Sequence, residues 1–369
     1  MGMMFAVRLV VVGLLGWAFC SSSLAAVNFP AIDRPAIKDR SPDRTYLLAA
    51  AQAGTRLVAV GERGIVVLSD DGGAHWHQAR EVPVSVTLTA LCFINAMHGW
   101  AVGHGGVVLR TDDGGETWLR QIEGGALARI ELESVKAREA QSPGDPEVEQ
   151  DRKLAEQLVA DGTDKPLLDV AFTDEEHGFV VGAEGLFFET TDGGRNWTSA
   201  MSRIQNPQRR HLYAIQAQHG AVFVAGEQGL LLRSQDGGER FQSLPSPYAG
   251  SWFCLAVLPN GALVAAGLRG HAFYSADSGT TWSPIPGTSP ASIVSVSPLP
   301  GDSALLADQS GRLMVSRDGG PATRIASAPF PLLAQVLMLP DKGLLEIGAA
   351  GVLRLPPSAI NLNVLEVAR

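Results

Sequence analysis

The chain has 369 residues, of which 46% are hydrophobic, with 41 glycines, 22 prolines and a formal net charge of −9. This composition supports a large buried core but is too rich in glycine for a helical bundle. The acidic balance and the absence of a basic run exclude nucleic acid as a predicted partner and argue against general adhesion to anionic lipid.

The first 26 residues have the pattern of a secretory signal peptide. Arg8 precedes an apolar run over 9–19, and the small residues at 21–26 predict cleavage after Ala25 or Ala26, which takes the net charge to about −10. The apolar run is short for a membrane span. We therefore expect a periplasmic or secreted protein with no membrane span after cleavage. A lipoprotein signal ending at Cys20 is the alternative, although Trp17 and Phe19 are bulkier than the residues such a signal uses.

Short β-branched or apolar stretches recur along residues 27–369, each with the length of a strand. In each unit a Gly-x-x-Gly turn lies between two of these stretches. The seven turns are GERG (61–64), GHGG (103–106), GAEG (182–185), GEQG (226–229), GLRG (267–270), DQSG (308–311) and GAAG (348–351). Their first positions are 42, 79, 44, 41, 41 and 40 residues apart, which indicates a repeat of about 40 residues with one insertion.

Six of the units also contain an octapeptide, here called the Asp box, with a hydroxyl residue first, aspartate third and glycine fifth. The six aspartates are Asp71, Asp113, Asp192, Asp236, Asp277 and Asp318. An aspartate followed by glycine closes a tight turn, because its carboxylate accepts backbone N–H groups two residues on and glycine takes a positive φ. The spacing does not fit an EF-hand loop. We interpret the Asp boxes as structural turns and predict no metal.

One repeat reads as strand, strand, Gly-x-x-Gly turn, strand, Asp box, strand. Seven four-stranded units favour an all-β fold, a seven-bladed β-propeller of antiparallel blades that occupies residues 27–369 as one domain. Repeat seven has no Asp box, so its fourth strand is expected from 363–368 or from 27–32, and the repeat spacing favours 363–368.

Residues 124–166 interrupt the pattern between blades 2 and 3. They contain few β-branched residues, and ten acids against five bases lie between Ala126 and Asp164. Asp145 before Pro146 is a helix start, and Leu154 with Leu158 has helical spacing. Two short helices are predicted, as either a solvated ornament or a docking arm.

In an up-and-down blade, the turn between the second and third strands and the link to the next blade lie on one face, here called the top face; the Asp boxes lie on the opposite, bottom face. The predicted partner-binding residues on the top face are Glu62, Arg63, His104, Glu184, Glu227, Gln228, Arg269 and Gln309, with Arg209 and Arg210 from the link at 205–212. Ordinary solvated loops are the alternative interpretation. No catalytic residue and no cofactor is predicted.

The Asp boxes and VGxxG hairpins over residues ~45–369 resemble the BNR/Asp-box propellers, specifically the photosystem II stability and assembly factor group. The resemblance implies a lumenal or periplasmic seven-bladed protein that assists the assembly of a membrane-protein complex. Similar proteins accompany export systems of the RND type. A monomer that binds a protein partner is therefore expected.

Sialidases and some glycoside hydrolases also carry Asp boxes, so an enzyme is the alternative function. A glycosidase needs two carboxylates about 5–10 Å apart, and Glu184 with Glu227 on adjacent turns is the pair to test. The chain has no FRIP-like arginine motif. Cys92 and Cys254 lie three blades apart, too far for a disulfide, and are expected to be small buried hydrophobic residues.

Overall fold

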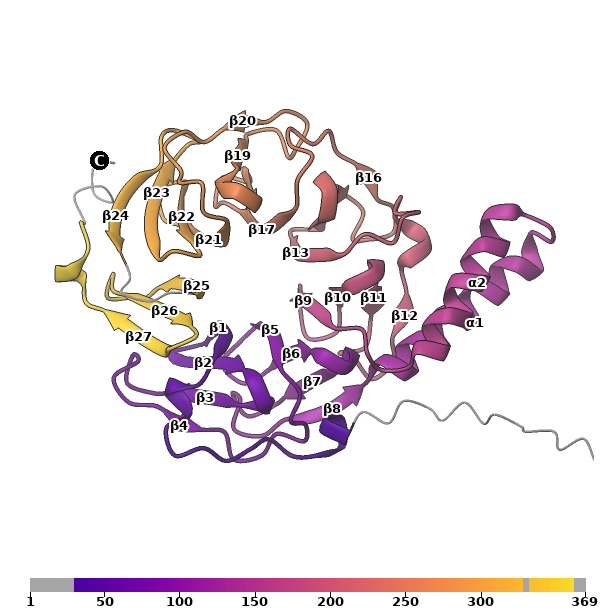
Figure 1. The fold of residues 1–369 in the computed structure, drawn as a ribbon, viewed down its shortest axis with the longest axis horizontal. Helices are drawn as coiled ribbons and strands as arrows, with labels where there is room; N and C mark the ends of the chain where they lie inside the picture. The colour runs from indigo at the N-terminus through magenta and orange to yellow at the C-terminus, as the bar shows by residue number, and fades with distance from the viewer. Residues whose placement is uncertain (1–29, 328–331, 362–369) are drawn as a thin grey trace, which may run out of the picture.

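The structure is a computed structural model that describes residues 30–327 and 332–361. Its strands form seven antiparallel sheets, the blades, arranged in a ring around a central axis (Figure 1). The strands of blades 1 to 3 are β1 (Leu47–Ala53), β2 (Arg56–Gly61), β3 (Val66–Ser69) and β4 (His77–Gln78); β5 (Leu88–Phe93), β6 (Gly99–Gly103), β7 (Val108–Thr111) and β8 (Leu119–Ile122); and β9 (Leu167–Phe172), β10 (Gly178–Gly182), β11 (Phe187–Thr190) and β12 (Thr198–Ser199).

Blades 4 to 7 follow the same order around the ring. Their strands are β13 (Leu212–Gln218), β14 (Ala221–Gly226), β15 (Leu231–Ser234) and β16 (Gln242–Ser243); β17 (Trp252–Val257), β18 (Leu263–Gly267), β19 (Ala272–Ser275) and β20 (Ser283–Pro284); β21 (Ile293–Leu299), β22 (Ser303–Asp308), β23 (Arg312–Arg317) and β24 (Thr323–Ser327); and β25 (Leu333–Met338), β26 (Leu344–Gly348) and β27 (Gly351–Leu355). The predicted all-β, seven-bladed propeller is confirmed.

The core lies between neighbouring blades. Five of the seven second strands, such as β6 and β10, are buried along their whole length, and β2 and β14 are buried except at their first residue. Aromatic rings fill the space between the sheets: Trp100 of blade 2 stacks on Phe172 of blade 3, and Phe187 of blade 3 meets Phe241 of blade 4 edge to face. Each blade therefore buries its apolar faces against the next blade in the ring.

The Gly-x-x-Gly turns contain short 3-10 turns on the top face: η3 (Glu62–Gly64), η4 (His104–Gly106), η5 (Ala183–Gly185), η7 (Glu227–Gly229) and η8 (Leu268–Gly270). In all seven blades, the residue after the first position donates its backbone N–H to the carbonyl that precedes the first strand. His104 N to Thr87 O, at 2.9 Å, is one example. A Cβ on Gly103 would lie 2.2 Å from that oxygen. The first glycine is thus required by the close approach of two backbone segments.

Other glycines of this type have the same surroundings. A Cβ on Gly61, Gly182, Gly226, Gly267 or Gly348 would lie 2.1–2.5 Å from the carbonyl oxygen before the first strand of its own blade. Blade 6 has Asp308 instead, and its buried carboxylate accepts backbone N–H groups from Ser310 and Arg312.

Five Asp boxes share one set of hydrogen bonds on the bottom face. In blade 2, Asp113 accepts from the backbone N–H and the hydroxyl of Thr117 at 2.9 and 2.6 Å, and Thr111 Oγ1 accepts the Gly115 N–H at 2.9 Å. Each of the five aspartates therefore accepts an N–H from four residues on, Asp71 also accepts one from three residues on, and the prediction of two residues on was wrong. The first-position hydroxyl holds the glycine instead, which has a φ of 94° in Gly115.

The sixth box departs from this pattern. Asp318 has a φ of 46°, Ser316 Oγ donates to the Gly320 carbonyl, and the Ala322 N–H, which would reach the aspartate in the other boxes, donates to Pro286 O. The prediction that Asp318 forms the same turn was wrong. The following position is Thr323, so this box also lacks the large ring that fills the eighth position elsewhere.

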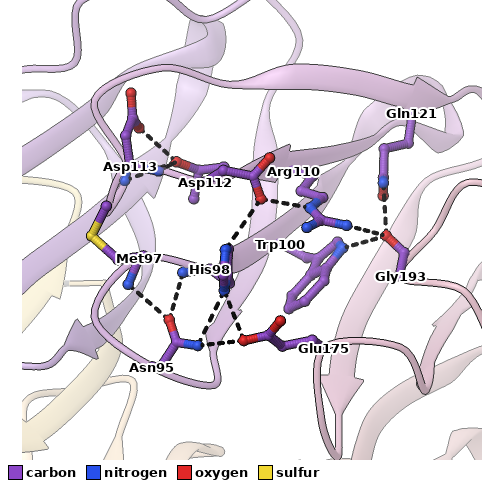
Figure 2. Close-up of polar contacts among 12 residues, drawn as sticks. Asn95, Met97, His98, Trp100, Arg110, Asp112, Asp113, Gln121, Glu175 and Gly193 are labelled. Atoms are coloured by element: carbon purple, nitrogen blue, oxygen red, sulfur yellow. Dashed lines mark hydrogen bonds and ion pairs between the residues drawn. The ribbon is translucent and has the colours of Figure 1, made fainter.

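The Asp boxes also join neighbouring blades, as Figure 2 shows for blades 2 and 3. The Gly193 carbonyl in the box of blade 3 accepts from Trp100 Nε1 at 3.3 Å, Arg110 Nη1 at 3.2 Å and Gln121 Nε2 at 2.8 Å, all from blade 2. Arg110 also lies over the Trp100 ring, 5.5 Å from its centroid. One carbonyl therefore gathers three donors at the seam between two blades.

The same contact recurs at three other seams. Arg56 donates to Gly114 O, Arg203 to Gly238 O and Arg233 to Ser278 O, each from one blade to the Asp box of the next.

The insertion forms two antiparallel helices, α1 (Gly124–Gln141) and α2 (Pro146–Asp161), which project outward from the ring beside blade 3 (Figure 1). Asp145 caps α2 through the Glu147 N–H. α1 contacts η4 and β12, and Leu127 and Leu158 join the apolar cluster shared by blades 2, 3 and 4. The predicted two helices are confirmed, and their base is packed into the ring. None of the described helices has the length and apolarity needed to cross a bilayer.

Within the described residues, blade 7 has three strands, β25 to β27. One candidate for its fourth strand, 363–368, lies outside those residues. The described part of the other candidate forms η1 (Pro30–Asp33), where the Ala31 carbonyl binds the Ser85 N–H beside blades 1 and 2. Residues 30–32 therefore contribute no strand to blade 7. The remaining 3-10 turns are η2 (Pro42–Arg44), η6 (Met201–Arg203) and η9 (Pro357–Ala359).

Replacing Gly103 with alanine should lower the free energy of unfolding by about 1–3 kcal/mol or more, because the added Cβ forces two backbone segments apart. Gly220→Ala is the control: its φ is 77° and its Cβ would meet no atom within 4 Å, so only the backbone strain of roughly 1–2 kcal/mol applies. Urea denaturation measures both. Equal losses would contradict the steric explanation.

Replacing Asp113 with alanine should lower the free energy of unfolding by about 1–3 kcal/mol, because the Thr117 N–H and hydroxyl lose their acceptor. Asp112→Ala, in the same box, removes an exposed carboxylate that binds Arg110 Nε and should cost less than about 1 kcal/mol. Thermal and urea denaturation give the comparison. A stoichiometric metal ion lost only from the Asp113 variant would overturn the structural interpretation of the boxes.

Candidate functional site

The top face surrounds one end of the central channel, and the Gly-x-x-Gly turns bring most of the predicted binding residues there. Four of the turns place a residue other than glycine in left-handed backbone, at φ between 52° and 57°. These residues are Arg63, Glu184, Gln228 and Arg269. In blade 2 the equivalent residue is Gly105. The side chains at these four positions are therefore presented at the tips of turns whose backbone would suit glycine better.

The predicted residues differ in how free they are. Arg63, His104, Gln228, Arg269 and Gln309 are exposed. Glu62 lies 4.0 Å from Arg63 within one turn. The exposed group consequently contains two arginines, on blades 1 and 5, and no acid, and Glu62 beside Arg63 is half-buried.

Glu184 and Glu227 are engaged with their neighbours. Glu184 forms an ion pair with Lys165 at 2.9 Å, and its backbone N–H donates to His211 Nδ1 at 2.7 Å. Glu227 Oε2 accepts the backbone N–H of His211 at 3.3 Å. The Glu227 carboxylate and the Glu184 backbone thus help to fix the link between blades 3 and 4, and the Glu184 carboxylate is paired with Lys165 just before β9.

Arg209 lies at the junction between this link and the helical insertion. Its guanidinium is 3.6 Å from Glu131 of α1 and 3.8 Å from Asp151 of α2, and only 18% of the side chain is exposed. Glu131, itself 2% exposed, also accepts from Ser199 Oγ of β12. Arg209 therefore fixes the helices to blade 3 and has little surface to offer a partner; Arg210 is half-buried beside it.

The channel is a cavity of about 390 Å³ lined by the first strand of every blade. Each of these inner strands has an irregular register between its first and third residues, next to the hydrogen bond from the Gly-x-x-Gly turn. The third residues, here called the inner ring, are Ala49, Ala90, Asp169, Ala214, Cys254, Ser295 and Gln335.

Polar members of the inner ring connect consecutive blades. Asp169 Oδ2 accepts the Ile215 N–H at 2.8 Å, Ser295 Oγ accepts the Val336 N–H at 3.2 Å, and Gln335 Oε1 accepts the Ala50 N–H at 2.6 Å. In each case the donor is the fourth residue of the next inner strand. These side chains therefore satisfy backbone groups that the irregular register leaves open.

Asp169 is the charged member of the inner ring. Its Oδ1 also accepts the Val170 N–H at 2.8 Å. Burial among the inner strands raises the pKa of this carboxyl to about 7, and the two backbone hydrogen bonds oppose that change. Sequence reasoning missed Asp169, although a single acid in the apolar stretch LLDVAF was visible.

The two cysteines lie along the same cavity as free thiols, with Cys254 buried and Cys92 partly buried. Burial, and secondarily the carboxylate of Asp169, raises the pKa of each thiol to about 12. The expectation that they form no disulfide agrees with the structure. Within the described part of the chain, no three His, Cys, Asp or Glu side chains converge to hold a metal ion.

Comparisons with known proteins confirm the resemblance predicted from the sequence. The family model described as Photosynthesis system II assembly factor YCF48 matches residues 148–285, from α2 to the end of blade 5. Over 42 residues the chain is 52% identical to the photosystem II assembly lipoprotein Ycf48 of Prochlorococcus marinus, and over 36 residues it is 56% identical to that of a Synechococcus strain. These matches cover 11% and 10% of this chain and only 12% and 11% of the relatives' length.

Solved structures have the same fold. The structure titled YCF48 bound to D1 peptide has a TM-score of 0.60 and 17% identity, over 88% of this chain and 99% of the other. YCF48 from Cyanidioschyzon merolae has a TM-score of 0.61 and 15% identity, over 85% and 97%. The WD40 propeller domain of Doa1 scores 0.60 at 9% identity, over 88% and 95%. At these identities the similarity shows the propeller fold alone.

The pKa of Asp169 predicts how stability varies with pH. A folded-state pKa of about 7 lies above the value of 3.8 for an aspartate in an unfolded chain, so between these values the folded chain binds one proton more than the unfolded chain. The free energy of unfolding should therefore fall as pH rises from ~4 to ~7, by on the order of 1–3 kcal/mol relative to Asp169→Asn.

Asp277→Asn provides a control of opposite sign. Hydrogen bonds from Thr281 and Ser275 lower the pKa of Asp277 to about 2, so its contribution to stability is present above the unfolded pKa and is lost as pH falls. Urea denaturation from pH 2.5 to 8.5 measures each difference, because the change at Asp277 falls between pH ~4 and ~2 and the change at Asp169 falls between pH ~4 and ~7. A flat difference between wild type and Asp169→Asn would contradict the assignment.

Proposed function

We propose that this chain is a non-catalytic, secreted or periplasmic propeller that binds a protein segment on its top face and assists the assembly or operation of a membrane-protein complex. One observation carries the proposal: three of the Gly-x-x-Gly turns hold an exposed side chain, Arg63, Gln228 or Arg269, at a positive φ. Left-handed backbone costs such a residue roughly 1–2 kcal/mol relative to glycine. The presence of these side chains at positions where glycine would be more stable favours a role for them in recognition.

The comparisons supply the class of partner. The relatives matched over short segments are named assembly lipoproteins of photosystem II, and a structure of the same fold is titled as bound to a D1 peptide. For this chain we propose the more general class, a segment of a membrane-protein complex, either photosystem II-like or an RND-type export system. Engagement of Glu184 by Lys165 and of Glu227 by His211 favours binding over glycoside hydrolysis.

The top-face arginines supply the test. The double variant Arg63→Glu, Arg269→Glu should weaken capture of the partner from the cell envelope and make the remaining binding less dependent on salt, because exposed charge pairs act mainly on encounter and register. The double variant should fold, since Glu184 already occupies the equivalent left-handed position in blade 3. Affinity capture followed by mass spectrometry identifies the partner.

A matched control uses two exposed arginines of the bottom face. Arg195 and Arg240 lie in the Asp boxes of blades 3 and 4, and the double reversal Arg195→Glu, Arg240→Glu changes the net charge by the same amount. It should leave capture unchanged. If the bottom-face variant abolishes capture while the top-face variant binds normally, with both folded by circular dichroism, the proposed binding face is wrong.

A further inference from the structure

The proposed function on the top face does not explain why the channel contains an acidic side chain, Asp169. The residues that line the cavity come from all seven inner strands, and among the described lining residues none is lysine, arginine or histidine. At the inner ring the other blades carry Ala49, Ala90, Ala214, Cys254, Ser295 and Gln335. The carboxylate therefore introduces a charge where an uncharged side chain serves the fold elsewhere.

The role of Asp169 in the fold could be filled without a charge. Ser295 and Gln335 accept the equivalent backbone N–H from the next blade, at 3.2 and 2.6 Å. Asp169 makes the same bond to Ile215, but with a second oxygen and a negative charge in a confined space. A confined carboxylate with no cation beside it is stabilised by a cation brought from outside.

Two aromatic rings line the same cavity as this carboxylate. Tyr213 and Phe253 are the second residues of the inner strands of blades 4 and 5, one position nearer the top face than the inner ring. Their rings meet edge to face with centroids 5.4 Å apart, and both residues are partly exposed. Leu168 and Val294 occupy the equivalent position in blades 3 and 6 and extend the apolar wall. Aromatic faces attract cations, and the apolar wall suits an alkyl chain.

The other titratable groups along the cavity do not compete for a cation. They are Cys92, Cys254 and Tyr213, and burial raises the pKa of each. At pH 8 these lining groups are uncharged, so Asp169 is the lining residue that supplies the attraction, and Glu227, which acts electrostatically on Tyr213, lies outside the lining. A volume of about 390 Å³ lies within the ordinary range for small-ligand sites.

We propose that the channel binds an alkylammonium or guanidinium group, with Asp169 as the counter-ion and Tyr213 and Phe253 against the alkyl chain. Two sources carry this chemistry: a free diamine, or a lysine or arginine side chain of a protein segment that enters the channel. Because a free diamine needs no partner, the inference stands or falls separately from the proposed function.

Isothermal titration calorimetry of the purified protein with 1,4-diaminobutane is the test, with 1-butanol as the neutral probe. The diamine should bind more tightly at pH 8 than at pH 5.5, since it requires the ionised carboxylate, and 1-butanol should not show this change. Asp169→Asn should weaken diamine binding by about tenfold or more, the value of a charge-assisted hydrogen bond. Glu149→Gln, which removes an exposed carboxylate on α2, is charge-matched and should have no effect.

Two further measurements separate the sources and guard against a variant that does not fold. The first compares the peptide Gly-Ser-Lys-Ser-Gly with its norleucine analogue. If the lysine peptide binds and Asp169→Asn abolishes this binding, the site is assigned to a protein segment. If only the diamine binds, the site is assigned to a free amine. As the second measurement, Phe253→Leu should lower the affinity for the probe several-fold without changing the pH dependence of binding. The proposal is overturned if neither probe binds at pH 8, or if binding is the same in Asp169→Asn.

Discussion

The hydrogen bond between each Gly-x-x-Gly turn and the carbonyl before the inner strand is the contact on which the rest of the ring depends. It recurs in all seven blades, and in six of them it brings backbone so close that only glycine fits. The approach coincides with the irregular register of the inner strand, which turns its second and third residues toward the channel. One backbone contact therefore sets both the shape of the top-face tips and the composition of the channel wall.

Local chemistry explains how much of the structure could be predicted from the sequence. Glycine spacing and short apolar stretches are properties of neighbouring residues, so the repeat, the seven blades and the two helices of the insertion were predictable. Contacts between blades were not, because they join residues about 40 or more positions apart: Gly193 accepts from Arg110, and Asp169 accepts from Ile215. The candidate site was therefore only partly predicted; its exposed tips were found, but the charged residue in the channel was overlooked.

The Asp boxes were correctly predicted as turns, but the hydrogen bonds within them were not. The turn was expected from Asp-Gly chemistry, in which the carboxylate reaches two residues on, but the first-position hydroxyl already holds the glycine N–H and leaves the aspartate to reach four residues on. Asp318 shares the letters of the motif without its bonds, because Ala322 is directed toward Pro286 instead. Arg209 likewise looked free in the sequence and is occupied by Glu131 and Asp151 of the insertion.

The four arginine contacts with Asp-box carbonyls described above point the same way along the chain. Arg56, Arg110, Arg203 and Arg233 each donate to the carbonyl of a residue that follows in the next blade, never the preceding one. A polypeptide chain is synthesised from its amino end, so each of these four arginines exists before the carbonyl that it binds. These four contacts can therefore form only once the following blade has been added to the chain.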